Sequence, residues 1–292
     1  MFLENVKTII LLAVLTGMLY GICYLLHIPP VFAIIIALVP NLIAYFFCDK
    51  FVLWSYNARI VDEHEMPQLH RMVEKIAIKA GIPKPRVAII ETPTPNAFAT
   101  GRSPKNAVVA VTTGILNLLT PEELEGVIAH EIGHIVHRDI LISSIVATIA
   151  GAIMYIADWL QWSLLFGFGR DEEEESPLSL IATLAFMILA PIAATLIQLA
   201  ISRQREFYAD EEGGRLSNPI YLANALAKLE KGVAVYPMEK GSPSTAHMFI
   251  VNPFKGEAIA KLFSTHPPTE ERIKRLLELA RKMGIYTPTI GY

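Results

Sequence analysis

His130-Glu131-Ile132-Gly133-His134 is the most informative stretch of this sequence. Residues four apart on an α-helix lie about 40° from each other around its axis, so both imidazoles project from one face. Two imidazoles on one face can bind a single zinc ion, and the neighbouring carboxylate can take a proton from a metal-bound water. The pentapeptide therefore predicts a helix with a hydrolytic zinc site, in which His130 and His134 are ligands and Glu131 is the general base.

The sequence just before the pentapeptide has the pattern of a helix start. Thr120 has a side chain suited to the N-cap, and Pro121 suits the first helical position. Glu123 stands where a capping box places the carboxylate that bonds back to the N-cap. We expect the metal-binding helix to begin here.

A catalytic zinc ion has three protein ligands and one open position, so a third ligand must come from elsewhere in the chain. The metzincin pattern needs glycine and histidine where this chain has His137 and Ile140, which excludes that class. In segment 202–210, Glu206 and Asp210 are four residues apart and share a helix face. We expect Glu206 to bind zinc and Asp210 to accept the free ring N–H of a ligand histidine. The alternative for these carboxylates is a surface charge pair.

The composition indicates membrane segments. Hydrophobic residues make up 53% of the 292 residues and charged residues only 18%, which is more apolar than a soluble protein needs. Runs without charge lie at 8–26, 28–48, 140–157 and 176–202, and each can cross about 30 Å of hydrocarbon as a helix. A cleaved signal peptide is the alternative for the first run, and a buried hairpin in a soluble core for the last two. We expect two hairpins of transmembrane helices.

Charges near the ends of these runs predict the orientation. Cytoplasmic ends of membrane helices carry more lysine and arginine than external ends. Lys50, Arg138 and Arg203 lie beside the runs, whereas the loop at 170–175 holds one arginine followed by five acidic residues. The acidic loop is therefore expected outside, in a protein of the cytoplasmic membrane.

Four regions follow from this topology. They are a transmembrane hairpin at 1–48, a first catalytic part at 49–139, a second hairpin with the acidic loop at 140–202, and a second catalytic part at 203–292. Both polar parts share the cytoplasmic face, so they can assemble into one domain.

The polar parts have helical and strand patterns in alternation. Helices are expected at 67–80, 218–231 and 268–283, and short strands at 87–90 and 107–111 with a turn at Asn106. The catalytic domain is therefore expected to be α+β, combined with transmembrane α-helices.

Two classes of site are disfavoured by composition. The net charge of −3 gives no basic footprint for nucleic acid. Cys23 and Cys48 are the only cysteines and both lie in apolar runs, so neither a disulfide framework nor a cysteine zinc site is expected.

Four segments resemble a known family. His-Glu-Ile-Gly-His-Ile-Val-His-Arg-Asp at 130–139, the carboxylate helix at 202–210, Pro-Asn-Ala-Phe-Ala-Thr-Gly at 95–101 and Ser-Thr-His-Pro-Pro-Thr-Glu-Glu-Arg-Ile at 264–273 are similar to HtpX-type membrane endopeptidases, relatives of the CAAX prenyl proteases. The resemblance implies a zincin-like (gluzincin) fold and one zinc ion on His130, His134 and Glu206. It also implies that the substrates are misfolded or damaged membrane proteins.

The same resemblance suggests a substrate-binding role for Asn96 and Ala97. In this superfamily the corresponding edge segment binds an extended substrate backbone, which agrees with the general way that a peptide adds to a sheet edge. An ordinary Pro-Asn turn is the alternative.

Three further histidines lie near the predicted chemistry. His266 can stabilise the oxyanion of the reaction, or it can support the start of the last helix. His247 is a rival for the same role. His137 is a possible ligand, but a position beside the metal site is the simpler interpretation.

The spacing between the ligands and the apolar runs places the site near a membrane. Six residues separate His134 from Ile140, about 9 Å of helix. Peptide bonds of membrane proteins and unfolded chains at the bilayer surface are then within reach.

Two rival functions remain at this point: an inactive membrane scaffold that keeps a zinc site, and a metal transporter, whose ligands belong within the spanning helices.

Overall fold

The computed structural model describes residues 29–150, 203–238, 243–254 and 266–285, together with single positions at 13, 16, 17, 20, 24 and 154. The apolar run at 176–202 and the acidic loop at 170–175 lie outside the described residues, as does nearly all of the run at 8–26.

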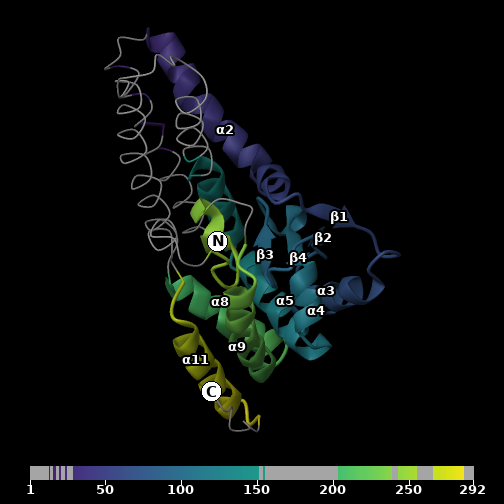
Figure 1. The fold of residues 1–292 in the computed structure, drawn as a ribbon. Coiled ribbons are helices and arrows are strands. Elements are labelled where there is room, and N and C mark those ends of the chain that lie inside the picture. Colours follow the sequence, from purple (N-terminus) through teal and green to yellow (C-terminus); the bar gives the residue numbers. More distant parts are fainter. Residues whose placement is uncertain are drawn as a thin grey trace, which may run out of the picture.

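A four-stranded mixed sheet forms one side of the domain (Figure 1). Its strands are β1 (Arg59–Val61), β2 (Arg86–Ile90), β3 (Ala97–Thr100) and β4 (Val108–Thr112), in the order β1-β2-β4-β3. The two strands expected from the sequence are β2 and β4, and they pair in parallel. β3, which lies between them in the chain, pairs antiparallel with β4 and forms one edge of the sheet.

The predicted helix beside the sheet is present as α3 (Pro67–Lys79). Its buried face consists of Leu69, His70, Val73, Ile76 and Ala77. The chain leaves α3 through Gly81, whose φ of 67° lies in the left-handed region that glycine adopts without steric cost.

The metal-binding helix α5 (Pro121–Val136) begins as the sequence predicts. The Thr120 side chain accepts a hydrogen bond from the backbone N–H of Glu123, and the Glu123 carboxylate accepts one from the N–H of Thr120. α4 (Thr113–Leu118) connects β4 to this start. Since both orphan N–H groups are satisfied, the helix has a fixed first turn and a fixed direction past the sheet.

Two helices from the second polar part pack against α5, and a third packs against those two. They are α8 (Arg203–Leu216), α9 (Pro219–Val235) and α11 (Thr269–Lys282). α5 and α8 approach closely at Gly213, where a Cβ atom would lie 2.7 Å from the backbone nitrogen of His130. Only glycine allows this approach, which brings the carboxylate helix against the histidine helix.

The edge strand β3 is held in place by contacts at both of its ends. The backbone N–H of Ile250 donates to the carbonyl of Ala97 at 3.1 Å, and the N–H of Gly101 donates to Ser144 Oγ at 3.3 Å. Beneath the strand, the buried rings of Tyr56, Phe98 and Phe249 pack with centroids 5.0–5.9 Å apart. β3 is therefore a rigid edge.

The long helix α2 (Pro30–Ser55) extends away from the sheet and helices (Figure 1). Large hydrophobic side chains are exposed along it, namely Val31, Phe32, Ile34, Ile35, Leu38, Val39, Leu42, Ile43, Phe46 and Phe47. Such a row of exposed apolar side chains is unusual unless another apolar phase covers it.

Among the described residues, no single helix has both the length and the hydropathy of a membrane span. One pair of helical segments meets these criteria together, Pro121–Val136 and Asp139–Ala150, which are bent by 89° at the break between them.

Candidate active site

The structure brings the three predicted ligands together. His130 and His134 project from α5 and Glu206 from α8, with one ligand atom of each within 4.8 Å of the others. Nε2 of His134 lies 3.4 Å from Glu206 Oε1, and Nε2 of His130 lies 3.9 Å from Glu206 Oε2. Ligands arranged tetrahedrally around zinc at about 2.0–2.1 Å are about 3.3 Å apart. The cluster is therefore close to the size of a zinc site.

The burial of this cluster also fits a metal ion. His130 is fully buried, and its Nε2 has no hydrogen-bond partner among the described residues. Burial alone would raise the pKa of Glu206, but His266 and His134 lower it well below the usual value. A buried carboxylate that stays ionised beside two imidazole nitrogens is a donor set that zinc favours.

His130 is oriented by a relay that ends on the last helix. Its Nδ1 lies 3.0 Å from Asp210 Oδ1. Asp210 in turn accepts two hydrogen bonds from Arg272, at 2.8 and 2.9 Å, while Arg272 Nη1 donates to the carbonyl of Ile250 at 2.7 Å. Burial would raise the pKa of Asp210, but the charge and hydrogen bonds of Arg272 lower it to about 2. Asp210 is therefore an anion beside Nδ1, a position that favours a proton on Nδ1 and directs Nε2 towards the metal position.

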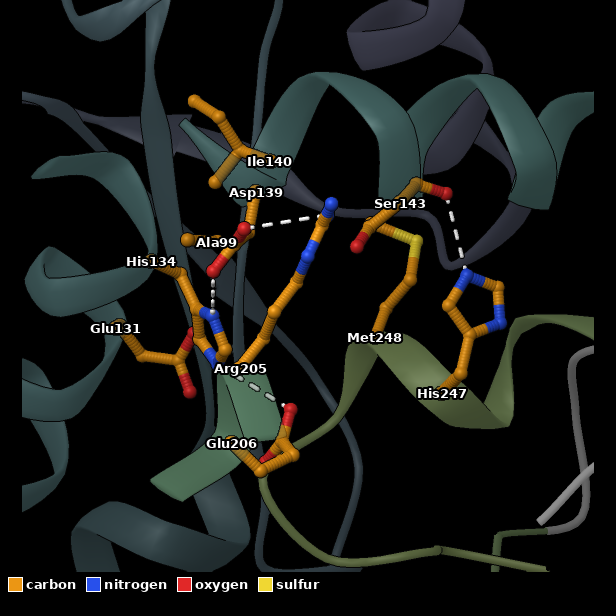
Figure 2. Close-up of a pocket in the computed structure, with 10 residues that line it drawn as sticks. All are labelled: Ala99, Glu131, His134, Asp139, Ile140, Ser143, Arg205, Glu206, His247 and Met248. Carbon is orange, nitrogen blue, oxygen red and sulfur yellow. Dashed lines mark hydrogen bonds and ion pairs between the residues drawn. The ribbon is translucent and has the colours of Figure 1, made fainter. Parts of the chain in front are cut away.

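His134 has an arrangement of the same kind, which Figure 2 shows. Its Nδ1 lies 3.3 Å from Asp139 Oδ2, and Arg205 Nη1 lies 3.2 Å from Asp139 Oδ1. Burial would lower the pKa of His134, but Glu206 and Asp139 raise it well above the usual value. The surroundings of His134 thus favour a positive charge at this point.

Glu131 is placed to act as a base. Burial raises its pKa to about 7, with opposing contributions from His134, which lowers it, and Glu206, which raises it. The backbone of Ala99 in β3 lies beside the carboxylate and lowers its pKa, while Oε1 has no hydrogen-bond partner among the described residues. A base with a pKa near neutrality and a free oxygen suits proton transfer from water.

A small cavity opens beside these groups. Its volume is about 20 Å³, about the space of one water. Figure 2 shows its lining, which consists of Ala99, Glu131, His134, Asp139, Ile140, Ser143, Arg205, Glu206, His247 and Met248. The cavity therefore joins the predicted base and two ligands to residues at the start of the third apolar run.

The two other histidines occupy different positions. His266 Nδ1 lies 3.3 Å from Glu206 Oε2 and Nε2 lies 3.4 Å from the carbonyl of Ala246, so His266 supports the ligand carboxylate. His247 lines the cavity, with Nε2 3.2 Å from the carbonyl of Ser143. The oxyanion role expected for His266 stays a prediction.

Asn96 and Ala97 are engaged within the protein. The Asn96 side chain is fully buried and donates to the carbonyl of Val251 at 2.7 Å. The carbonyl of Ala97 accepts a hydrogen bond from Ile250. Ala99 is the β3 residue that lines the cavity.

Arg272, Asp139 and Arg205 are site residues that the sequence interpretation missed. Arg272 follows His266 by six residues and had no visible partner in the sequence. Asp139 and Arg205 each lie close to an apolar run and were given no role in the site. Their proximity to the pentapeptide and to Glu206 was the available signal.

Comparisons with known proteins give a consistent result. A model of the family described as "Peptidase family M48" matches residues 63–280. A protein named "Protease HtpX homolog" from Methanocaldococcus jannaschii is 67% identical over 283 residues, covering 97% of this chain and 99% of the relative. Its namesake from Pyrococcus abyssi is 56% identical over 283 residues, covering 96% and 97%.

One further relative and one solved structure are also similar to this chain. The "Protease HtpX homolog" of Persephonella marina is 54% identical over 288 residues, covering 97% of this chain and 99% of the relative. The crystal structure of S. mikatae Ste24p aligns with a TM-score of 0.49 and 18% identity, covering 94% of this chain and 66% of that one. The family model and the high-identity relatives confirm the resemblance drawn from the motifs, and this chain belongs to peptidase family M48 as a metalloprotease of the HtpX type.

Proposed function

We propose that this metalloprotease is a zinc endopeptidase of the cytoplasmic membrane, which cuts unfolded or damaged membrane proteins at the cytoplasmic surface of the bilayer. The observation that supports this most directly is the position of the site at the 89° bend between α5 and Asp139–Ala150. Ile140 and Ser143, which line the cavity, belong to the third apolar run. A substrate bond at the mouth of the cavity would lie next to the point where that run begins.

Zinc is the metal that the donor set favours, because two imidazoles and one carboxylate with an open position are the ligands of many zinc hydrolases. When bound, the ion lowers the pKa of its water towards about 7 and polarises the scissile carbonyl. Glu131 then takes the proton of the attacking water at its carboxylate and passes it to the departing amine nitrogen. Asp210 keeps the imidazole of His130 in the tautomer that presents Nε2.

The exposed side chains of α2 support the membrane part of the proposal. The second apolar run, 28–48, coincides with the exposed part of this helix. A lipid phase would bury these side chains, whereas water would leave them as a large apolar surface. Lys50 lies two residues after the end of this run and is expected at its cytoplasmic end.

An extended, unfolded substrate fits the edge strand. A peptide that lies alongside β3 can reach the backbone of Ala99, which is directly beside Glu131. A folded protein cannot present its backbone in this way, so unfolded segments and loops at the membrane surface are the substrates that we infer.

Cleavage of one unfolded segment in two contexts tests the proposal. The same segment is offered either attached to a membrane-spanning helix or as a soluble protein, with the enzyme in lipid vesicles or in detergent micelles. We expect faster cleavage of the membrane-attached form in vesicles, and loss of that advantage in micelles. Equal rates in all four combinations would refute the membrane-surface function.

Glu131→Gln is the control for the chemistry. It should abolish cleavage in every context while the protein keeps its zinc, because glutamine preserves the shape but cannot accept the proton. Cleavage by this variant at the original rate would refute the role of Glu131. It would not affect the conclusion about cleavage at the membrane surface.

A further inference from the structure

The two histidine ligands have matching surroundings. Each presents Nε2 towards Glu206, and each has its Nδ1 beside an aspartate that an arginine contacts. For His130 these partners are Asp210 and Arg272. We propose that Asp139, held by Arg205, is a second positioning residue, which orients His134 for the metal. This inference rests on the proposed zinc site and is independent of the membrane substrate.

The contact between His134 and Asp139 depends on a break in the helix. In an unbroken helix, a residue five positions after His134 would lie about 140° around the axis and point away from it. α5 instead ends at Val136, and Arg138 has a φ of 60°. A positive φ is uncommon for a residue other than glycine and often marks a functional position. Here it brings Asp139 back to His134.

Arg205 fixes Asp139 from the other ligand helix. It precedes the ligand Glu206 by one residue and reaches Asp139 Oδ1 at 3.2 Å, while Oδ2 faces His134 at 3.3 Å. Asp139 is 4% exposed and the Arg205 side chain 12% exposed, so water screens this ion pair only weakly. Each carboxylate oxygen therefore has one partner, and Asp139 connects the helix of His134 to the helix of Glu206.

The bonding pattern defines what Asp139 contributes. An anionic acceptor at Nδ1 keeps the proton on that nitrogen, which leaves the lone pair of Nε2 free for a metal ion. It also limits rotation of the imidazole, because the ring must keep Nδ1 on Asp139 and Nε2 on the metal ion at the same time. If the ion pair between Asp139 and Arg205 served only to hold two helices together, the second carboxylate oxygen would not need to lie beside the imidazole of His134.

Zinc affinity of the full chain tests this role. Metal-free protein in detergent is titrated with Zn²⁺ in competition with a chromophoric chelator, and no peptide substrate is used. For Asp139→Asn we expect zinc affinity to fall about 10- to 100-fold, as for other residues that orient metal ligands. The absorption spectrum of the Co²⁺-loaded variant should also change, because the geometry around the ion is altered.

Two further variants complete the experiment. Arg205→Gln leaves Asp139 beside His134, so we expect a smaller loss of zinc affinity in the same direction. Glu211→Gln is the matched control: it removes the exposed ion pair between Glu211 and Arg215 on the same helix, and zinc affinity should stay unchanged.

The outcomes separate orientation from simple helix packing. Wild-type zinc affinity and an unchanged Co²⁺ spectrum in both Asp139→Asn and Arg205→Gln would overturn the proposal. A lower melting temperature of the metal-free protein with unchanged zinc affinity would overturn it as well. If Asp139→Asn does not fold, Arg205→Gln alone carries the test by the same two measurements. Because only metal binding is measured, failure of the proposed membrane function would not alter either result.

Discussion

Replacing Arg272 by methionine should destabilise the protein strongly. Arg272 is 1% exposed and makes two hydrogen bonds to Asp210 and one to the carbonyl of Ile250. Methionine has a similar length and fills most of the space, but it leaves a buried carboxylate without its counter-charge. Removing one partner of a buried ion pair costs about 3–5 kcal/mol, which is a large share of a typical folding free energy of about 5–15 kcal/mol.

This cost can be converted into a melting temperature. For a domain of this size, each kcal/mol shifts Tm by about 2–4 °C, so we expect a fall of about 6–20 °C. The assay is thermal unfolding of the full chain in detergent with a metal chelator present, because bound zinc would stabilise the folded state and hide part of the effect. Zinc affinity should fall as well, since Asp210 orients His130.

The matched control for this substitution is Arg281→Met. Arg281 lies in the last turn of the same helix and is exposed, where its interaction with the helix dipole contributes under about 1 kcal/mol. A melting temperature for Arg272→Met within the range of this control, with unchanged zinc affinity, would refute the reasoning about the buried relay.

Three other predictions concern two helices around the site and the metal ion. Gly213→Ala should weaken zinc binding, because the new methyl group meets the backbone of His130 and pushes α8 with Glu206 away from α5. The measurement is zinc affinity in a chelator competition, and an unchanged affinity would contradict this separation of the helices. Thr120→Ala removes the cap of α5 and should lower stability by about 1 kcal/mol, while zinc affinity per folded molecule stays the same; a loss of affinity as large as that of Gly213→Ala would contradict the assignment of Thr120 to the helix start. Removing zinc from the wild-type protein should lower Tm. Adding zinc at 100 times its Kd should raise the free energy of unfolding by about 2.7 kcal/mol over that of the metal-free protein. A Tm that does not respond to zinc would contradict binding at this site.

The sequence predicted the parts of the fold that have strong local signals. α5 was predicted from a capping box and the spacing of two histidines, and α3 from its apolar period followed by Gly81. β1 and β3 were missed as strands because three or four residues are too few to display an alternating pattern. β2 and β4 pair in parallel although β3 lies between them in the chain, and neither strand alone indicates this order.

The same distinction applies to the site. Two spacings of four residues predicted His130, His134, Glu206 and Asp210, and the structure places these side chains around one point. Arg272 could not be paired with Asp210 from the sequence, because 62 residues separate them and arginine is rarely buried.

Asp139 was missed for a different reason. In a continuous helix it would face away from His134, and nothing in the local sequence, such as glycine or proline, marks the break at Arg138. The topology of the runs at 8–26 and 176–202 stays a prediction.

The contacts at the two ends of β3 also affect how readily another chain can add to this sheet. An open sheet edge would allow any such chain to add as a new strand and begin an aggregate. Here Ile250 occupies the backbone at Ala97 and Ser144 occupies it at Gly101, so the protein's own residues close the edge on either side of Ala99. Between these two contacts lies Ala99, which lines the cavity together with Glu131. Another chain therefore finds too few free backbone groups on β3 to add as a stable extra strand.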